Sequence, residues 1–79
     1  MYNQYLSIEE QFKDALSNEE ILRIKDQELR DIRMRHWIYQ NKIHHDYANI
    51  SDEELCRLVN IDCEKEKREI EEYRKRKGI

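Results

Sequence analysis

Two cysteines and three histidines are the side chains of this chain most able to do chemistry. Thiolates and imidazoles are the usual ligands of zinc, and a thiolate activated by a neighbouring base is a nucleophile. The spacing favours neither role, because Cys56 and Cys63 do not form a Cys-x-x-Cys pair, and adjacent His44 and His45 would point about 100° apart on a helix. We therefore expect no metal ion and no cofactor, and we interpret the cysteines as small core residues.

Catalysis has equally little support in the sequence. No sequence feature places a base beside either cysteine, and the only glycine, Gly78, leaves no glycine-rich loop that would hold a phosphate group. His36 lies among apolar residues, where it would be a pH-sensitive group or, as we favour, a polar residue that fixes helix register or is partly exposed. We predict that the protein is not an enzyme and has no catalytic residues.

Residues 51–70, SDEELCRLVNIDCEKEKREI, resemble a helix-turn-helix motif. Asn60 would take the turn position that is usually glycine, Ile61 would be the apolar residue after the turn, and Asp62 would cap the second helix. The resemblance implies a DNA-binding transcriptional regulator that acts through residues 51–77. The would-be recognition helix carries three glutamates against three bases, whereas a helix in the major groove brings positive charge to phosphates. DNA binding is therefore the alternative function.

Aromatic residues, methionine and arginine gather in residues 29–43, LRDIRMRHWIYQNKI. These residue types are enriched in the centres of protein interfaces, although arginines beside aromatics also occur in single-stranded nucleic-acid sites. We predict a partner-binding surface formed by Arg33, Met34, Arg35, Trp37, Ile38 and Tyr39. The expected role is a regulator, adaptor or inhibitor that binds another protein, and the composition suggests an AT-rich source such as a phage or mobile element.

The elements that must position these residues are helices. The chain has no proline, one glycine and 42% charged residues among its 79, a composition that favours helix throughout. We predict a single small all-α domain with a three-helix arrangement: a short N-terminal helix, a long central helix and a C-terminal helix. One core in so short a chain rarely contributes more than roughly 3–5 kcal/mol, so the fold is expected to need help of the kind that a partner, a metal or self-association provides.

Serine caps mark the predicted helix starts. Three serines are each followed three residues later by glutamate, which is the capping-box spacing: Ser7, Ser17 and Ser51. We predict four segments from these signals, namely a flexible arm over 1–6, helix 1 over 7–17, a central helix over 18–47 and a C-terminal helix over 51–77. Gly78 supplies the final stop, and the charged end of the last helix is expected to project into solvent.

The predicted central helix is apolar on more than one side. One stripe has coiled-coil spacing and is expected to hold the fold: Leu22, Leu29, Ile32, His36, Tyr39 and Ile43. A second set lies off that stripe: Ile24, Met34, Trp37 and Ile38. The last helix has an apolar face interrupted by Glu66, with Leu58 and Ile61 outside it. Because the flanking helices supply few large side chains, we expect a homodimer or another protein to cover the second face.

Charge and hydropathy limit the other partners. The net charge of −3 is too small to favour a protein that imitates nucleic acid. No run of 18 or more apolar residues is present, and residues 1–20 lack the basic and apolar regions of a secretory signal. We therefore expect no membrane partner and a cytoplasmic location.

Overall fold

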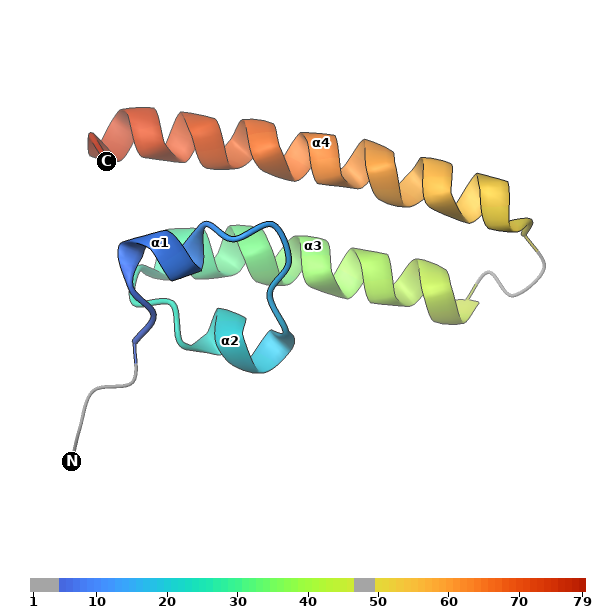
Figure 1. The fold of residues 1–79 in the computed structure, drawn as a ribbon, viewed down its shortest axis with the longest axis horizontal. Coiled ribbons are helices and arrows are strands. Elements are labelled where there is room, and N and C mark those ends of the chain that lie inside the picture. Colours follow the sequence, from blue (N-terminus) through green and yellow to red (C-terminus); the bar gives the residue numbers. More distant parts are fainter. Residues whose placement is uncertain (1–4, 47–49) are drawn as a thin grey trace.

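A computed structural model describes residues 5–46 and 50–79, and helices are the regular secondary structure of those ranges (Figure 1). The helices follow one another as α1 (Ile8–Gln11), α2 (Asn18–Leu22), α3 (Gln27–Asp46) and α4 (Asp52–Lys77). The predicted all-α class is confirmed, with a long central helix and a long C-terminal helix. The predicted count of three is wrong, because the described residues form four helices.

The two long helices, α3 and α4, lie side by side in opposite directions and form a helical hairpin (Figure 1). The short helices α1 and α2 cover only the half of the hairpin that contains the start of α3 and the end of α4. We call this the proximal half. The distal half, residues 38–46 and 52–61, extends beyond α1 and α2 as two helices (Figure 1).

The predicted central helix over 18–47 is divided between α2 and α3. Helix α2 ends in a tighter, 3₁₀-type turn. The amides of Arg23 and Ile24 donate hydrogen bonds to the carbonyls three residues earlier, at 2.9 and 3.1 Å. Asp26 then begins a new helix, since its Oδ1 accepts from the Glu28 amide at 3.0 Å as an N-cap. The break lets Ile24 turn inward, where it is fully buried. Tyr47, the predicted last residue, lies outside the described residues.

Helix 1, predicted over 7–17, is a single turn. Its capping box is present, with the Ser7 amide donating to Glu10 Oε1 at 2.9 Å and the Glu10 amide to Ser7 Oγ at 3.1 Å. The helix stops at Gln11 because the guanidinium of Arg33 donates to the carbonyls of Gln11 and Asp14, at 2.7 and 3.3 Å. Those carbonyls would otherwise accept bonds from later turns of the same helix.

The C-terminal helix agrees with its prediction at both ends. Ser51 Oγ accepts from the Glu54 amide at 3.1 Å, and Gly78 closes the helix in the left-handed region with φ 73°. Its charged end does not project into solvent as predicted. Tyr73 is only 2% exposed, its ring lies 6.4 Å from that of Phe12, and its hydroxyl donates to Asp26.

The hydrophobic core lies in the proximal half: Leu6, Leu16, Ile21, Ile24, Leu29, Ile32 and Tyr73. Of the predicted stripe, Leu29, Ile32, His36 and Ile43 are buried, whereas Leu22 and Tyr39 are 62% and 45% exposed. The predicted arm is not free at its end, because Leu6 is buried and its amide donates to the Arg23 carbonyl at 3.0 Å. Residues 1–4 of that arm lie outside the described residues.

No helix within the described ranges combines the length and the apolar character that crossing a lipid bilayer requires.

Candidate functional site

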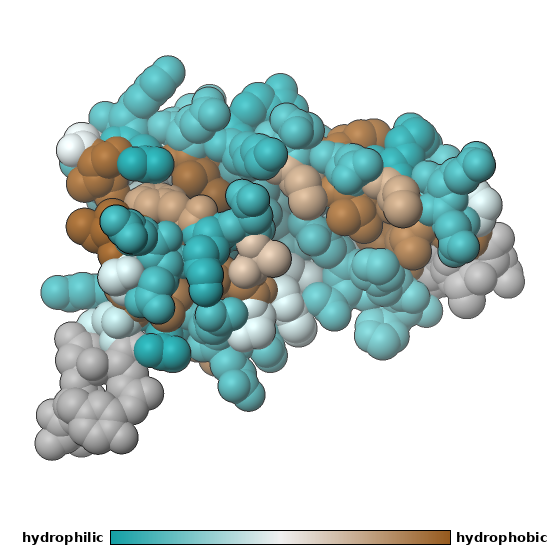
Figure 2. Space-filling model, viewed as in Figure 1, coloured by the Kyte–Doolittle hydropathy of each residue, from teal (hydrophilic) through white to brown (hydrophobic). Residues whose placement is uncertain are grey.

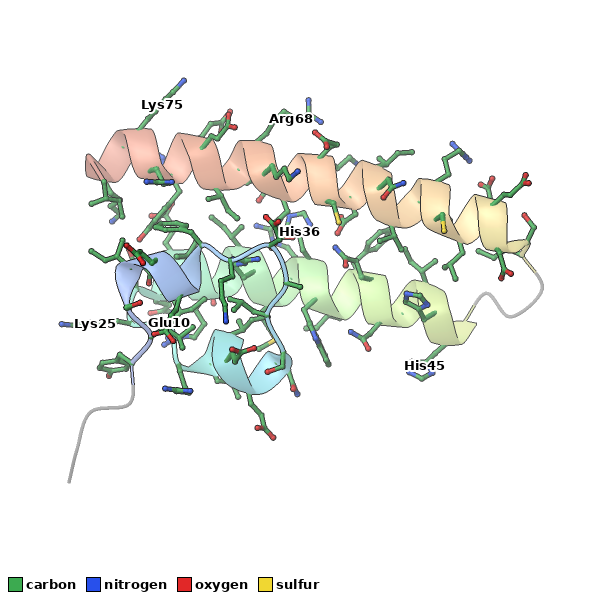
Figure 3. All side chains as sticks on the ribbon, viewed as in Figure 1. Glu10, Lys25, His36, His45, Arg68 and Lys75 are labelled. Carbon is green, nitrogen blue, oxygen red and sulfur yellow. The ribbon has the colours of Figure 1, made fainter. Side chains whose placement is uncertain are left out.

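The middle of the α3–α4 seam is polar and is centred on His36, which Figure 3 places between the two helices. His36 is 5% exposed, its Nδ1 lies 2.9 Å from Asp62 Oδ1, and its Nε2 lies 2.9 Å from Glu69 Oε1. Each ring nitrogen therefore faces a carboxylate, and an imidazole protonated at both nitrogens donates to both. This geometry joins α3 to α4 at one defined register.

Two further side chains complete this polar cluster. Gln40 Nε2 donates to Asp62 Oδ2 at 2.9 Å, and Arg35 Nη2 donates to Glu69 Oε2 at 3.0 Å. Burial raises the pKa of the Glu69 carboxyl, but hydrogen bonds from Arg35 and His36 outweigh burial and leave that pKa below its ordinary value. Glu69 therefore remains a carboxylate that links Arg35 and His36.

Arg33 is a buried structural residue rather than a rim residue of an exposed surface. It is 3% exposed, and its Nε lies 3.0 Å from Glu66 Oε2. Its Nη1 donates to the carbonyl of Gln11, the last residue of α1, and its Nη2 donates to the carbonyl of Asp14. Glu66, which appeared to interrupt the apolar face of the last helix, is the counter-charge of this buried guanidinium. Arg33 therefore leaves the predicted partner surface and belongs to the core.

The seam is poorly arranged for nucleophilic or metal chemistry. Burial raises the pKa of the Cys63 thiol, and the neighbouring charges of Glu66 and Asp62 raise it further. The thiol form is thus favoured over the nucleophilic thiolate. Asp62 and Glu69 bond opposite nitrogens of His36, so their carboxylates do not converge on one point. Within the described residues, no group of three or more His, Cys, Asp or Glu side chains could hold a metal ion.

The other predicted partner-binding residues divide into two groups. Met34 and Trp37 are half-buried and pack against the core cluster. Ile38 and Tyr39 are exposed, at 54% and 45%, and Arg35 is exposed beside its partner Glu69. The structure thus leaves Ile38, Tyr39 and Arg35 available on the surface.

The helix-turn-helix interpretation of residues 51–70 is wrong as a structure. Helix α4 continues through Asn60 and Ile61 without a turn, since both residues lie inside the unbroken helix Asp52–Lys77. Asn60 is exposed there. The bases at its end also have partners within the chain. Arg76 pairs with Glu28, Lys77 lies 3.8 Å from Asp26, and Arg74 lies 4.6 Å above the Phe12 ring.

Sequence reasoning missed the part of the surface that α4 contributes. Ile61 is 43% exposed and Leu58 is half-buried, and both lie in the distal half. Their spacing of three residues, which places both on one side of the helix, was the signal that could have identified them. The sequence pattern had only excluded them from the core face.

No protein-family model, curated protein or solved structure matches this chain.

Proposed function

We propose that this protein is a non-enzymatic regulator, adaptor or inhibitor that binds another protein through the distal half of its helical hairpin. One observation carries the proposal: three large apolar side chains are exposed together on the distal half, where the described residues form only two packed helices. Ile38, Tyr39 and Ile61 are 54%, 45% and 43% exposed there.

Among the described residues, only α3 and α4 form the distal half. In the proximal half, α1 and α2 cover the hairpin, and the core cluster forms between them and the long helices. On the face from which α1 and α2 are seen, Figure 2 also shows apolar residues at the surface over the α3–α4 seam beyond these two helices. A partner that covers the distal half would bury these side chains and gain the free energy of removing apolar area from water, about 25 cal/mol per Å².

The types of residue also fit a protein interface. Tyrosine is enriched at interface hot spots because it gives a large contact area with little conformational entropy to lose. Tyr39 is such a residue, and the apolar Ile38 and Ile61 are exposed around it in the distal half.

The test compares capture of proteins from extracts by the wild-type chain and by the variant Tyr39→Glu/Ile61→Glu. We expect the wild type to retain at least one protein that the variant loses, while circular dichroism shows equal helix content because both positions are exposed. Leu22→Glu is the matched control, since Leu22 is 62% exposed but lies on α2. Identical protein sets for all three chains would refute the proposal.

Self-association is the second way to cover this surface. Sedimentation of the purified wild type and of Tyr39→Glu/Ile61→Glu separates the two cases. A wild-type dimer that becomes a monomer in the variant would show that a second copy, rather than another protein, covers the distal half.

A further inference from the structure

Both carboxylates that face His36 accept hydrogen bonds on their second oxygen as well. Glu69 Oε1 lies 2.9 Å from His36 Nε2, and Glu69 Oε2 accepts from Arg35 at 3.0 Å. Asp62 Oδ1 lies 2.9 Å from His36 Nδ1, and Asp62 Oδ2 accepts from Gln40 at 2.9 Å. With acceptors on both sides of the ring, each ring nitrogen must supply an N–H. Only the imidazolium form of histidine has both.

Loss of one proton from His36 would break one of these two bonds. A neutral imidazole keeps a single N–H, and its other nitrogen has a lone pair in place of a proton. At a separation of 2.9 Å, that lone pair would face the lone pairs of a carboxylate oxygen. Because His36 is only 5% exposed, little water can reach the ring to replace the lost bond. The neutral ring therefore fits one contact with α4 and opposes the other.

Several other ionisable side chains surround this cluster, from both long helices and from the connection between α1 and α2: Asp14, Arg33, Arg35, Cys63, Lys65 and Glu66. Arg33 and Glu66 pair with each other at 3.0 Å, and Arg35 is bound to Glu69. Burial raises the pKa of the Cys63 thiol, which keeps it neutral. Asp14 and Lys65 are exposed, so water and salt screen their charges. The carboxylates of Asp62 and Glu69 are thus the charges in direct contact with the ring.

The His36 cluster lies where the proximal half of the hairpin meets the distal half. The core cluster is proximal, whereas Ile43 is the one buried apolar side chain among the described residues of the distal half. The distal half therefore depends more heavily on polar contacts for its packing. Tyr39 follows His36 by three residues on α3, and Ile61 directly precedes Asp62 on α4. The bonds of His36 consequently fix the position of Tyr39 relative to Ile61.

We propose that a proton on His36 holds the distal half of the hairpin closed, and that the distal half opens when a rise in pH removes this proton. The folded chain uses the proton in two bonds to carboxylates, and the unfolded chain uses it in none, so the proton stabilises the folded, closed state. An unfolded histidine loses its proton near pH 6.5. The stabilisation is therefore fully present below about pH 6.5 and is lost as the pH rises above that value.

The consequence for binding rests on the proposed function. A partner that contacts Tyr39 and Ile61 together would bind the closed hairpin better than the open one, because only the closed form holds the two side chains in one arrangement. The opening itself does not depend on any partner. It is a property of the chain alone and is measured without one.

Amide hydrogen exchange of the full chain, at about pH 6 and about pH 8.5, measures the opening. Protection factors correct for the direct effect of pH on the exchange chemistry. We expect protection in residues 38–46 and 52–61 to fall about tenfold at the higher pH, since a hydrogen bond to a charged group contributes about that much. Protection in residues 29–34 and 70–77, which pack against the proximal core, should change by less than about twofold.

Glu69→Gln should remove the pH dependence while keeping the contact. The new amide offers an oxygen that accepts from Arg35 and an N–H that donates to the unprotonated Nε2 of His36, while Nδ1–H still donates to Asp62. The neutral ring then fits both neighbours. We expect distal protection in this variant to differ by less than about twofold between the two pH values. A residue with a merely structural role would leave the tenfold fall in place.

His44→Gln/His45→Gln is the matched control, because these two histidines are exposed at the end of α3, where positive charge also favours a helix. Figure 3 shows His45 projecting away from α4, whereas His36 lies between the helices. This variant should keep the tenfold fall. An unchanged distal protection in the wild type, an equal fall in Glu69→Gln, or loss of the fall in the control would each overturn the inference. Capture of a protein by the wild type but not by Tyr39→Glu/Ile61→Glu would support the proposed function whichever exchange result is obtained.

Discussion

Arg33 on α3 donates from Nη1 to the carbonyl oxygen of Gln11 at 2.7 Å, across 22 residues of the chain. The same guanidinium pairs with Glu66 on α4, with Nε 3.0 Å from Oε2. One side chain therefore holds the end of α1, α3 and α4 together. A buried arginine is tolerated here because its charge and its donors are matched by a carboxylate and by backbone carbonyls.

Removal of Arg33 should destabilise the protein far more than removal of Arg35. Arg33→Leu leaves a carboxylate and two carbonyls without their donor, and we expect a loss of about 3–5 kcal/mol. Arg35→Leu, at a side chain 61% exposed, should cost less than about 1 kcal/mol. Urea unfolding of both variants measures the difference. Equal losses would show that the buried contacts of Arg33 contribute little.

The His36 cluster should show strong coupling between its members. His36→Leu leaves buried Asp62 with only its bond from Gln40, so we expect a loss of about 1–3 kcal/mol. The double variant His36→Leu/Asp62→Leu removes both partners and should recover part of that loss, since a buried apolar pair needs no hydrogen bonds. A double-mutant cycle by urea unfolding tests this, and strictly additive losses would contradict it.

Tyr73 should make the fold sensitive to alkali. Burial, together with the hydrogen bond to Asp26, raises the pKa of Tyr73 to about 12. The unfolded chain loses this proton near pH 10, so the stabilisation is fully present below about pH 10 and is lost as the pH rises towards about 12. Tyr73→Phe should cost about 1 kcal/mol near neutral pH and show a smaller alkaline loss than the wild type. An unchanged alkaline profile in Tyr73→Phe would contradict this assignment.

Substitutions at Asn60 distinguish a continuous helix from a helix-turn-helix. In the middle of α4, Asn60→Ala should be more stable than Asn60→Gly by about 1 kcal/mol, because alanine favours helix and glycine does not. At a left-handed turn the order would be reversed, since glycine adopts that conformation without strain. Thermal unfolding of the two variants gives the order directly.

The sequence was sufficient for the features that depend on nearby residues. The start of α4 follows from Ser51 and its end from Gly78, since caps act within a few residues. The start of α3 was missed, although Asp26 followed by Gln27 and Glu28 is a local cap signal. Strong helix propensity on both sides concealed it, and burial of Ile24 decided in favour of the break.

Features that depend on distant partners were beyond sequence reasoning. The buried positions of Arg33 and His36 require carboxylates 33 and 26 residues away, from Glu66 and Asp62. Periodicity finds apolar faces but does not pair charges between helices. The candidate surface was predicted in part for the same reason: Tyr39 was identified from its own helix, whereas Ile61 joins it only when α4 folds back.

The most direct test of the proposed protein-binding role is photo-crosslinking from the surface itself. The photoreactive amino acid p-benzoylphenylalanine would replace Tyr39 in one chain and Ile8, which is 59% exposed on α1, in a control chain. Both chains would be irradiated in the same extract and analysed by mass spectrometry. We predict a discrete crosslinked protein at position 39 and none at position 8; the same adducts at both positions, or none at position 39, would contradict a binding site on the distal half of the hairpin.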